Sequence, residues 1–169
     1  IDEDKRFISI YRKCKPYTLT TKERMYALYK SVEYVVNAQI PGDFVECGVW
    51  SGGSTMLIAH TLLELNETNK KIYLYDTFEG MSEPTEEDYH VENKNIHALD
   101  TLKKFKKKEA DNNWSYVSLQ EVRDNMSSTR YPEKNLIFVK GKVEETIPKT
   151  VPSKIAILRL DTDWYESTK

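Results

Sequence analysis

The sequence predicts an α/β fold in which a parallel sheet carries helices on both faces. Short apolar stretches that resemble strands alternate along the chain with stretches of helical pattern, as in sheets built from strand–helix–strand units. The first strand runs directly into a glycine-rich turn and then a helix, which is typical of nucleotide-binding α/β domains. The chain has 169 residues, 39% of them hydrophobic, so residues 1–169 are expected to form one domain around one core.

The first predicted helix follows Thr20 and Glu23, which are spaced as in a capping box, and it ends by Pro41-Gly42. Its apolar residues recur at helical spacing, so one face is expected to be buried. Three further helices are expected over Ser54–Leu65, Asn95–Glu109 and Leu119–Ser127.

Four strands are expected, at Phe44–Gly48, Lys71–Tyr75, Asn135–Lys140 and Lys154–Leu160. The last of them is too apolar to lie as an open edge of the sheet in water. We therefore expect the sheet to continue in residues beyond Lys169, so that the domain is truncated at its C-terminus. The alternative is that copies of the chain associate through this strand into a homo-oligomer.

The stretch Thr77–Asn95 is polar, acidic and rich in turn signals. A loop longer than about 12–15 residues in a compact domain is usually functional or disordered. Because it directly follows a predicted strand end, we expect it to act as a lid. Amide hydrogen exchange in the loop should then slow when a ligand binds, and unchanged exchange would contradict the lid.

Composition excludes several classes of function. The 25 Lys and Arg residues nearly balance the 27 Asp and Glu residues, which argues against nucleic acid as a partner. The basic run Lys103–Lys108 is interpreted as a solvated helix face, with a phosphate-binding patch as the alternative. Cys14 and Cys47 lie far apart in the predicted fold and are expected to be reduced thiols of a cytoplasmic protein. No apolar run approaches the about 20 residues that span a membrane, so no membrane association is expected.

The segment GDFVECGVWSGGST carries the strongest functional signal. A strand, a glycine turn and a helix N-terminus form a pocket for a nucleotide-like ligand, and Gly48, Trp50, Ser54 and Thr55 are candidate lining residues. Glu46 lies near the exit of the strand, where its charge would repel a pyrophosphate and attract a cationic ligand. S-adenosylmethionine, which carries an ammonium and a sulfonium, therefore suits this segment better than NAD or ATP.

Asp76 is the second candidate, because it ends the next strand 30 residues beyond Glu46. An acidic residue at this point commonly binds ribose hydroxyls, and Thr77 lies beside it. The turn Gly48–Gly53 does not fit G-x-G-x-x-G, which disfavours a dinucleotide. The alternative is that Asp76 is a turn or cap residue.

Two further pairs of candidate residues follow the third and fourth predicted strands. Asp161 and Asp163 would lie on one side of an extended backbone, beyond the strand ends, where carboxylate oxygens suit Mg²⁺. The alternative is that Asp163 caps a final helix, because Glu166 stands three positions on. Gly141 and Lys142 follow the third strand, and a glycine there either lets a flat ring approach the backbone or forms a simple turn.

Together, PGDFVECGVWSGGS, YLYDTFEGM and ILRLDTDWYEST resemble the macrocin-type O-methyltransferases, the TylF family. The resemblance extends from about Thr20 to Lys169 and includes SLQEVRDNM and FVKGKVEETIP. It implies a Rossmann-like class I methyltransferase sheet, in which the third, second, first and fourth strands lie side by side in that order. It also implies S-adenosylmethionine as cofactor and Mg²⁺-dependent methylation of a sugar hydroxyl on a small molecule.

The resemblance also implies roles for single residues. Glu46 and Gly48 would line the methionine part of the cofactor, Asp76 would hold its ribose, and Gly141 with Lys142 would lie near its adenine. Asp161 would be a metal ligand and Asp163 the general base. The family supplies further metal ligands from an Asp-Asp pair after the next strand, so residues 1–169 alone are expected to be metal-free and inactive.

Other readings remain open from the sequence. A catechol- or phenol-type O-methyltransferase would use similar metal chemistry, and the acceptors that support turnover would distinguish it. A non-catalytic cofactor-binding domain would lack the Asp-Asp pair altogether.

Ser51 stands where many members of the family carry Arg or Lys, which leaves the glycine turn more negative.

Overall fold

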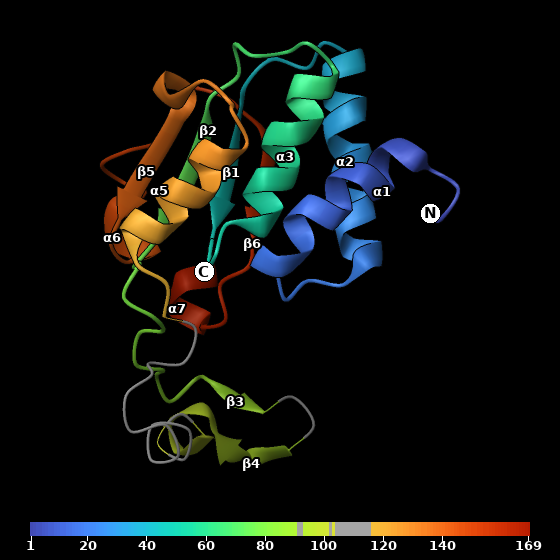
Figure 1. Cartoon of the computed structure of the whole chain (residues 1–169). Helices are drawn as coiled ribbons and strands as arrows, with labels where there is room; N and C mark the ends of the chain where they lie inside the picture. Colours follow the sequence, from blue (N-terminus) through green and yellow to red (C-terminus); the bar gives the residue numbers. More distant parts are fainter. Residues whose placement is uncertain (91–92, 102, 104–115) are drawn as a thin grey trace.

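In the computed structural model, which describes residues 1–90, 93–101, 103 and 116–169, a parallel sheet carries helices on both faces (Figure 1). Its four strands are arranged in the order β5-β2-β1-β6. This order agrees with the predicted one, in which the third, second, first and fourth strands lie side by side. The strands are β1 Asp43–Cys47, β2 Ile72–Asp76, β5 Leu136–Lys140 and β6 Ile155–Leu160, each paired in parallel with its neighbours.

The N-terminal part of the chain forms helices that cover one face of this sheet. The elements are α1 Lys5–Cys14, the 3-10 helix η1 Lys15–Tyr17, α2 Lys22–Asn37 and α3 Gly53–Glu64. Helix α1 was not predicted, although its buried residues Phe7, Ile10 and Cys14 recur at helical spacing. The cap predicted for α2 was wrong by one residue: Thr21, and not Thr20, accepts from the backbone N–H of Arg24.

The two faces of the sheet are covered to different extents. The α1–α3 face also receives α5 Leu119–Ser128, which follows a well-formed Ser118 cap. Strand side chains alternate between the faces. Phe44, Ile72, Leu74 and Leu136 belong to the main core on this side. The opposite face holds a smaller cluster of Val45, Cys47, Tyr73, Tyr75 and Val143, with Val143 coming from α6 Val143–Thr146.

Strand β6 lies at one edge of the four-stranded sheet, and the expectation that further residues or a second copy cover it stays a prediction. Leu158 and Leu160 are 51% and 47% exposed there. Both free cysteines, Cys14 and Cys47, are buried. Of the helices in the described ranges, none combines the length and the apolar character needed to cross a membrane.

The region after β2 differs from the prediction. Within the stretch expected to be an irregular loop, β3 Tyr89–His90 pairs with β4 Asn93–His97 in an antiparallel hairpin that projects from the main body (Figure 1). The predicted start of a helix at Asn95 is therefore wrong, because helical residues begin only at 98 and include 98–101 and 103. Residues 104–108 of the basic run, the rest of that helix and Trp114 lie outside the described residues.

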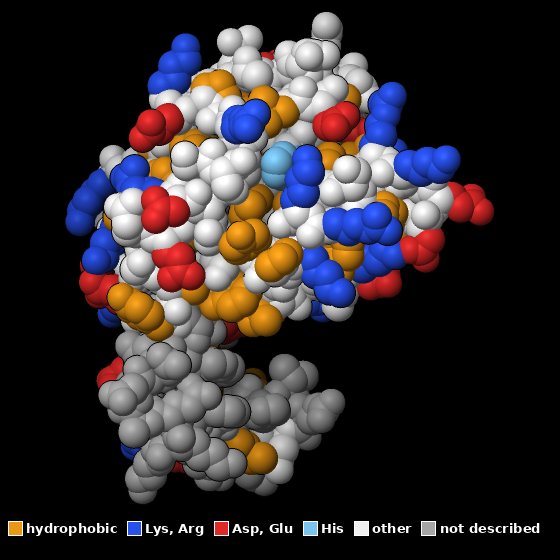
Figure 2. Space-filling model, viewed as in Figure 1, with side chains coloured by type: hydrophobic (Ala, Val, Ile, Leu, Met, Phe, Trp, Pro, Cys, Tyr) orange, Lys and Arg blue, Asp and Glu red, His pale blue; other side chains and the backbone are white. Residues whose placement is uncertain are grey.

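Two short elements complete the chain: the 3-10 helix η2 Glu133–Asn135, which leads into β5, and α7 Tyr165–Thr168. Asp163 does not cap α7, since the N-cap residue is Trp164, whose side chain makes no capping bond. Figure 2 shows Lys and Arg side chains gathered over the α1 side of the molecule, where Lys5, Arg6, Arg12 and Lys13 are exposed.

Candidate functional site

A cavity of about 300 Å³ lies at the carboxyl end of the parallel strands. This is the edge at which open α/β sheets bind ligands. The residue sets predicted from the sequence come together in its wall: Glu46, Gly48, Trp50, Ser54, Asp76, Thr77, Gly141, Lys142, Asp161 and Asp163. Thr55 is the exception, because it is fully buried behind the wall and does not line the cavity.

The glycine turn after β1 is shaped by two close backbone approaches. Gly48 has φ +82°, and a Cβ there would lie 2.4 Å from the carbonyl oxygen of Asp161. A Cβ on Gly53 would lie 2.5 Å from the carbonyl oxygen of Tyr17. Only glycine permits both contacts, which bring the end of β6 and the end of η1 against the turn. Trp50 has φ +49°, an uncommon conformation for a bulky residue that clusters at functional sites.

Glu46 lies on the α3 side of β1 and is only 1% exposed. Thr55 of α3 donates to its Oε2, and Arg159 Nη1 donates to its Oε1 at 2.7 Å. Burial raises the pKa of Glu46 to about 7, against the opposing effects of Arg159 and Thr55. Glu46 therefore has an internal cationic partner, which the sequence argument for a cationic ligand did not include.

Arg159 is the main functional residue that the sequence analysis missed. It pairs with Glu46 in the register of β1 and β6, and its Nη1 also lies 2.9 Å from Asp161 Oδ2. Its Nη2 donates to Thr20 Oγ1 at 3.1 Å. The signal available in the sequence was a single charged residue inside an otherwise apolar strand, because such a residue requires a buried partner.

The contacts of Asp76 are compatible with both proposed roles, which are holding the turn and binding a ribose. Its Oδ2 accepts from the backbone N–H groups of Val49 and Trp50 at 2.7 and 3.1 Å, and its Oδ1 accepts from Phe78 N at 2.8 Å. These bonds make it the residue that clamps the glycine turn, which agrees with the turn interpretation. Because Asp76 also lines the cavity, a ribose hydroxyl would meet a carboxylate that three backbone N–H groups already hold in place.

Asp161 and Asp163 lie together at the end of β6, where both line the cavity. Burial of its carboxyl and the negative charge of Asp161 raise the pKa of Asp163, which makes it a stronger base. Asp161 Oδ2 bonds Arg159, and its other carboxylate oxygen has no hydrogen-bond partner among the described residues. In the part of the chain that the structure describes, no group of three or more His, Cys, Asp or Glu is arranged to hold a metal ion.

One wall of the cavity comes from the end of η1, the start of α2 and the segment between them, which the sequence analysis did not assign to the site. Its lining residues are Tyr17, Thr18, Leu19, Thr20 and Arg24. Among the described residues, the Arg24 guanidinium has no hydrogen-bond or ion-pair partner. The pocket therefore contains an uncompensated cation on the β1–β6 side, in addition to Lys142 on the β5 side.

The opposite wall comes from the segment after β2. Gly80, Met81 and Ser82 line the cavity, and the Ser82 carbonyl accepts from Trp164 Nε1 at 2.9 Å. Further along, Asp88 is 7% exposed and its Oδ1 accepts from the backbone N–H of Tyr165 at 2.7 Å. This segment is thus joined to the residues after β6 across the cavity. That it acts as a lid stays a prediction.

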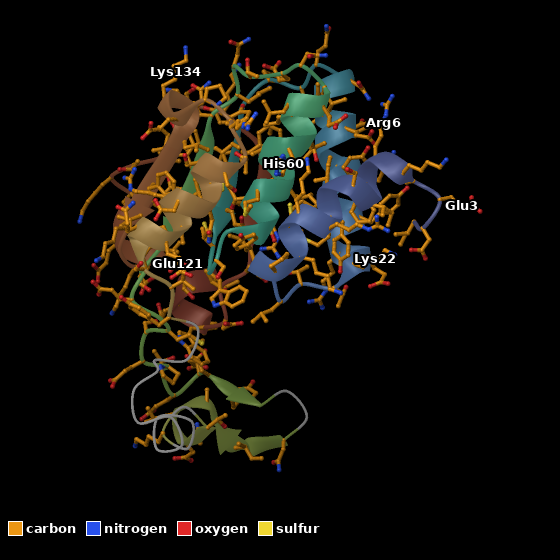
Figure 3. The ribbon with its side chains drawn as sticks, viewed as in Figure 1. Glu3, Arg6, Lys22, His60, Glu121 and Lys134 are labelled. Atoms are coloured by element: carbon orange, nitrogen blue, oxygen red, sulfur yellow. The ribbon has the colours of Figure 1, made fainter. Side chains whose placement is uncertain are left out.

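His60, the histidine labelled in Figure 3, projects from α3 and is not among the residues that line the cavity. Burial, together with the charge of Lys13, lowers its pKa.

Among curated proteins, the chain is 30% identical over 167 residues to the 8-demethyl-8-(2,3-dimethoxy-alpha-L-rhamnosyl)-tetracenomycin-C 4'-O-methyltransferase of Streptomyces olivaceus, covering 99% of this chain and 60% of that protein. It is 28% identical over 153 residues to the demethyldecarbamoylnovobiocin O-methyltransferase of Streptomyces niveus, covering 90% of this chain and 54% of that protein. The chain thus spans between half and two thirds of the length of these relatives.

The chain also resembles solved structures of methyltransferases. The O-methyltransferase NovP matches with a TM-score of 0.73 and 28% identity, covering 90% of this chain and 58% of that one. CalS11, a calicheamicin methyltransferase, matches with a TM-score of 0.57 and 19% identity over 99% of this chain and 70% of that one, which shows the fold alone. The family model described as macrocin-O-methyltransferase (TylF) matches residues 1–169. The chain belongs to the macrocin O-methyltransferase (TylF) family.

Proposed function

We propose that this chain forms the cofactor-binding part of an S-adenosylmethionine-dependent O-methyltransferase that acts on a hydroxyl of a sugar carried by a small molecule. The observation that carries the proposal is the single cavity in which the glycine turn, Asp76 and the pair Asp161 and Asp163 meet. Membership of the family supports methyl transfer. The names of the relatives, which include a methyltransferase for a rhamnosyl tetracenomycin, support a glycosylated acceptor.

The strand order supports one orientation of the cofactor in the cavity. Asp76 ends β2 and Gly141 directly follows the neighbouring strand β5, so the ribose would bind at Asp76 and the adenine beside Gly141 and Lys142. The methionine part would then extend past Gly48 toward the β6 side. There the free guanidinium of Arg24 is the group that suits its carboxylate.

The reaction asks the protein chiefly to align two molecules and to remove one proton. The bound sulfonium is already an activated methyl donor. The cavity walls would hold the acceptor hydroxyl in line with the methyl group and keep water out. Asp163 would accept the hydroxyl proton, in keeping with the raised pKa of its carboxyl.

Magnesium belongs to the same proposal. Mg²⁺ favours a few carboxylates and keeps several water ligands, so the free oxygen of Asp161 and the neighbouring Asp163 fit it. When bound, the ion would lower the pKa of the acceptor hydroxyl. Among the described residues no group of three or more His, Cys, Asp or Glu is arranged to hold a metal ion, so metal binding by these residues alone is expected to be weak.

A methyl-transfer assay tests the proposal. The full-length protein is incubated with S-adenosylmethionine labelled in the methyl group, with and without Mg²⁺, and with rhamnosylated or simple phenolic acceptors. Label in the sugar that depends on Mg²⁺ is the expected result. Label found only in the phenol would assign the protein to the catechol-type alternative, and no transfer to either class would favour a non-catalytic domain.

A further inference from the structure

Arg159 lies behind the cavity and does not line it, yet it contacts three residues that do. Nη1 bonds Glu46 of β1 and Asp161, which follows β6, and Nη2 bonds Thr20, which precedes α2. These three residues come from three separate parts of the chain.

We propose that Arg159 is a positioning residue that sets the shape of the methionine end of the cavity by holding Thr20, Glu46 and Asp161 in one arrangement. The inference rests on the proposed function, because it takes S-adenosylmethionine to be the ligand of the cavity. It assigns Arg159 no contact with the cofactor. Its effect passes through the three residues that it bonds.

The geometry suits arginine in particular. The guanidinium is a planar fork whose two terminal nitrogens point to different partners at fixed angles, whereas a lysine ammonium is a single point charge. Here one nitrogen serves the two carboxylates and the other serves the Thr20 hydroxyl. The side chain is 17% exposed, so these bonds lie in a mostly dry environment and are screened little by water.

A simpler role has to be separated from this one. Glu46 is a buried carboxylate, and Arg159 opposite it in the strand register could serve only to neutralise its charge. In that case removing both charges together would restore both stability and ligand binding, because nothing would remain to be compensated. A positioning role gives a different result, since Thr20 and Asp161 lose their partner however Glu46 is changed.

The experiment uses four variants in addition to the unaltered protein. Arg159→Met removes the fork, Glu46→Gln removes the buried charge, the double variant removes both, and Arg159→Lys keeps a charge without the fork. Arg6→Met is the matched control, because Arg6 is exposed on α1 (Figure 3) and is not among the residues that line the cavity. S-adenosylhomocysteine binding is measured by calorimetry, and Tm is measured on the same samples.

We expect the double variant to have a Tm close to that of Glu46→Gln. It should, however, bind S-adenosylhomocysteine at least ten-fold more weakly than Glu46→Gln does. Arg159→Lys should keep most of the Tm and also bind at least ten-fold more weakly than the unaltered protein, while Arg6→Met should change neither quantity. If Arg159→Met does not fold, the double variant and Arg159→Lys still decide the question.

Binding by the double variant as tight as that by Glu46→Gln would overturn the positioning role and leave Arg159 as a charge partner only. This result is distinct from failure of the proposed function, which would show as no S-adenosylhomocysteine binding by the unaltered protein. That second result would overturn the proposed function and, with it, this inference.

Discussion

The carboxylate of Asp76 holds the glycine turn after β1, because its Oδ2 accepts from the backbone N–H of Val49 at 2.7 Å. The residue that ends β2 therefore fixes the backbone that would face a cofactor beside β1. One side chain thus both shapes the pocket and offers a carboxylate to its ligand.

Replacing Asp76 by Ala is expected to weaken S-adenosylhomocysteine binding by about 1–3 kcal/mol, the cost of leaving ribose hydroxyls unpaired. Tm should fall as well, because the N–H groups of Val49 and Trp50 lose their acceptor. Calorimetry with 5′-methylthioadenosine, which keeps the ribose, should show a loss of similar size. A lower Tm with unchanged affinity for both ligands would leave Asp76 as a turn residue only.

Replacing Arg24 by Met is expected to weaken S-adenosylhomocysteine binding by about 1.5–3 kcal/mol, the usual size of a hydrogen bond to a charged group. The free guanidinium in the cavity wall is the reason. Here 5′-methylthioadenosine serves as the control, because it lacks the amino-acid part and should bind as before. Equal losses for both ligands would mean that Arg24 shapes the pocket without meeting the carboxylate.

Glycine substitutions test the close approach of β1 and β6. Gly48 and Gly52 both have positive φ, but a Cβ on Gly52 has no neighbour nearer than Val122 Cγ1 at 3.5 Å. Gly52→Ala should therefore cost about 1–2 kcal/mol from the backbone conformation alone. Gly48→Ala should cost clearly more, because its Cβ would meet the carbonyl oxygen of Asp161 at 2.4 Å. Equal losses of unfolding free energy in denaturant titrations would argue against this contact.

The buried carboxyl of Glu46 predicts a dependence of stability on pH. Burial raises its pKa from 4.5 to about 7, so the folded state holds a proton that the unfolded state releases between these values. The contribution of Glu46 to stability is present below pH 4.5 and is lost as the pH rises to about 7, by at most about 3 kcal/mol.

Denaturant titrations of the unaltered protein and Glu46→Gln between pH 4.5 and 8 would check this dependence. The stability of the unaltered protein relative to the variant should decline up to about pH 7 and stay level above it. A difference that grows with pH would mean that the ion pair with Arg159 outweighs burial and lowers the pKa of Glu46.

Much of the fold was readable from the sequence because its signals are local. The strand segments before and after the glycine turn are short and apolar, and the structure places β1 and β2 within one residue of the predicted bounds. The hairpin of β3 and β4 was missed because its residues are polar and show no sustained alternation. Helix α1 was missed although its buried residues already formed a helical pattern.

The site was predicted less completely because its remaining contacts are between distant parts of the chain. Asp76, Asp161 and Asp163 follow strands, and the ends of parallel strands meet at one edge of the sheet. The pairing of Arg159 with Glu46 depends on the register between strands 113 residues apart, which no local pattern reports. The wall around Arg24 likewise depends on how η1 and α2 pack against the turn.

The measurement that tests the central claim most directly is a pair of calorimetric titrations of the protein, one with S-adenosylhomocysteine and one with NAD. The cavity beside Asp76, with its acidic residues and a turn that does not fit the dinucleotide pattern, predicts binding of S-adenosylhomocysteine and weaker or undetectable binding of NAD. Tighter binding of NAD than of S-adenosylhomocysteine would contradict the account.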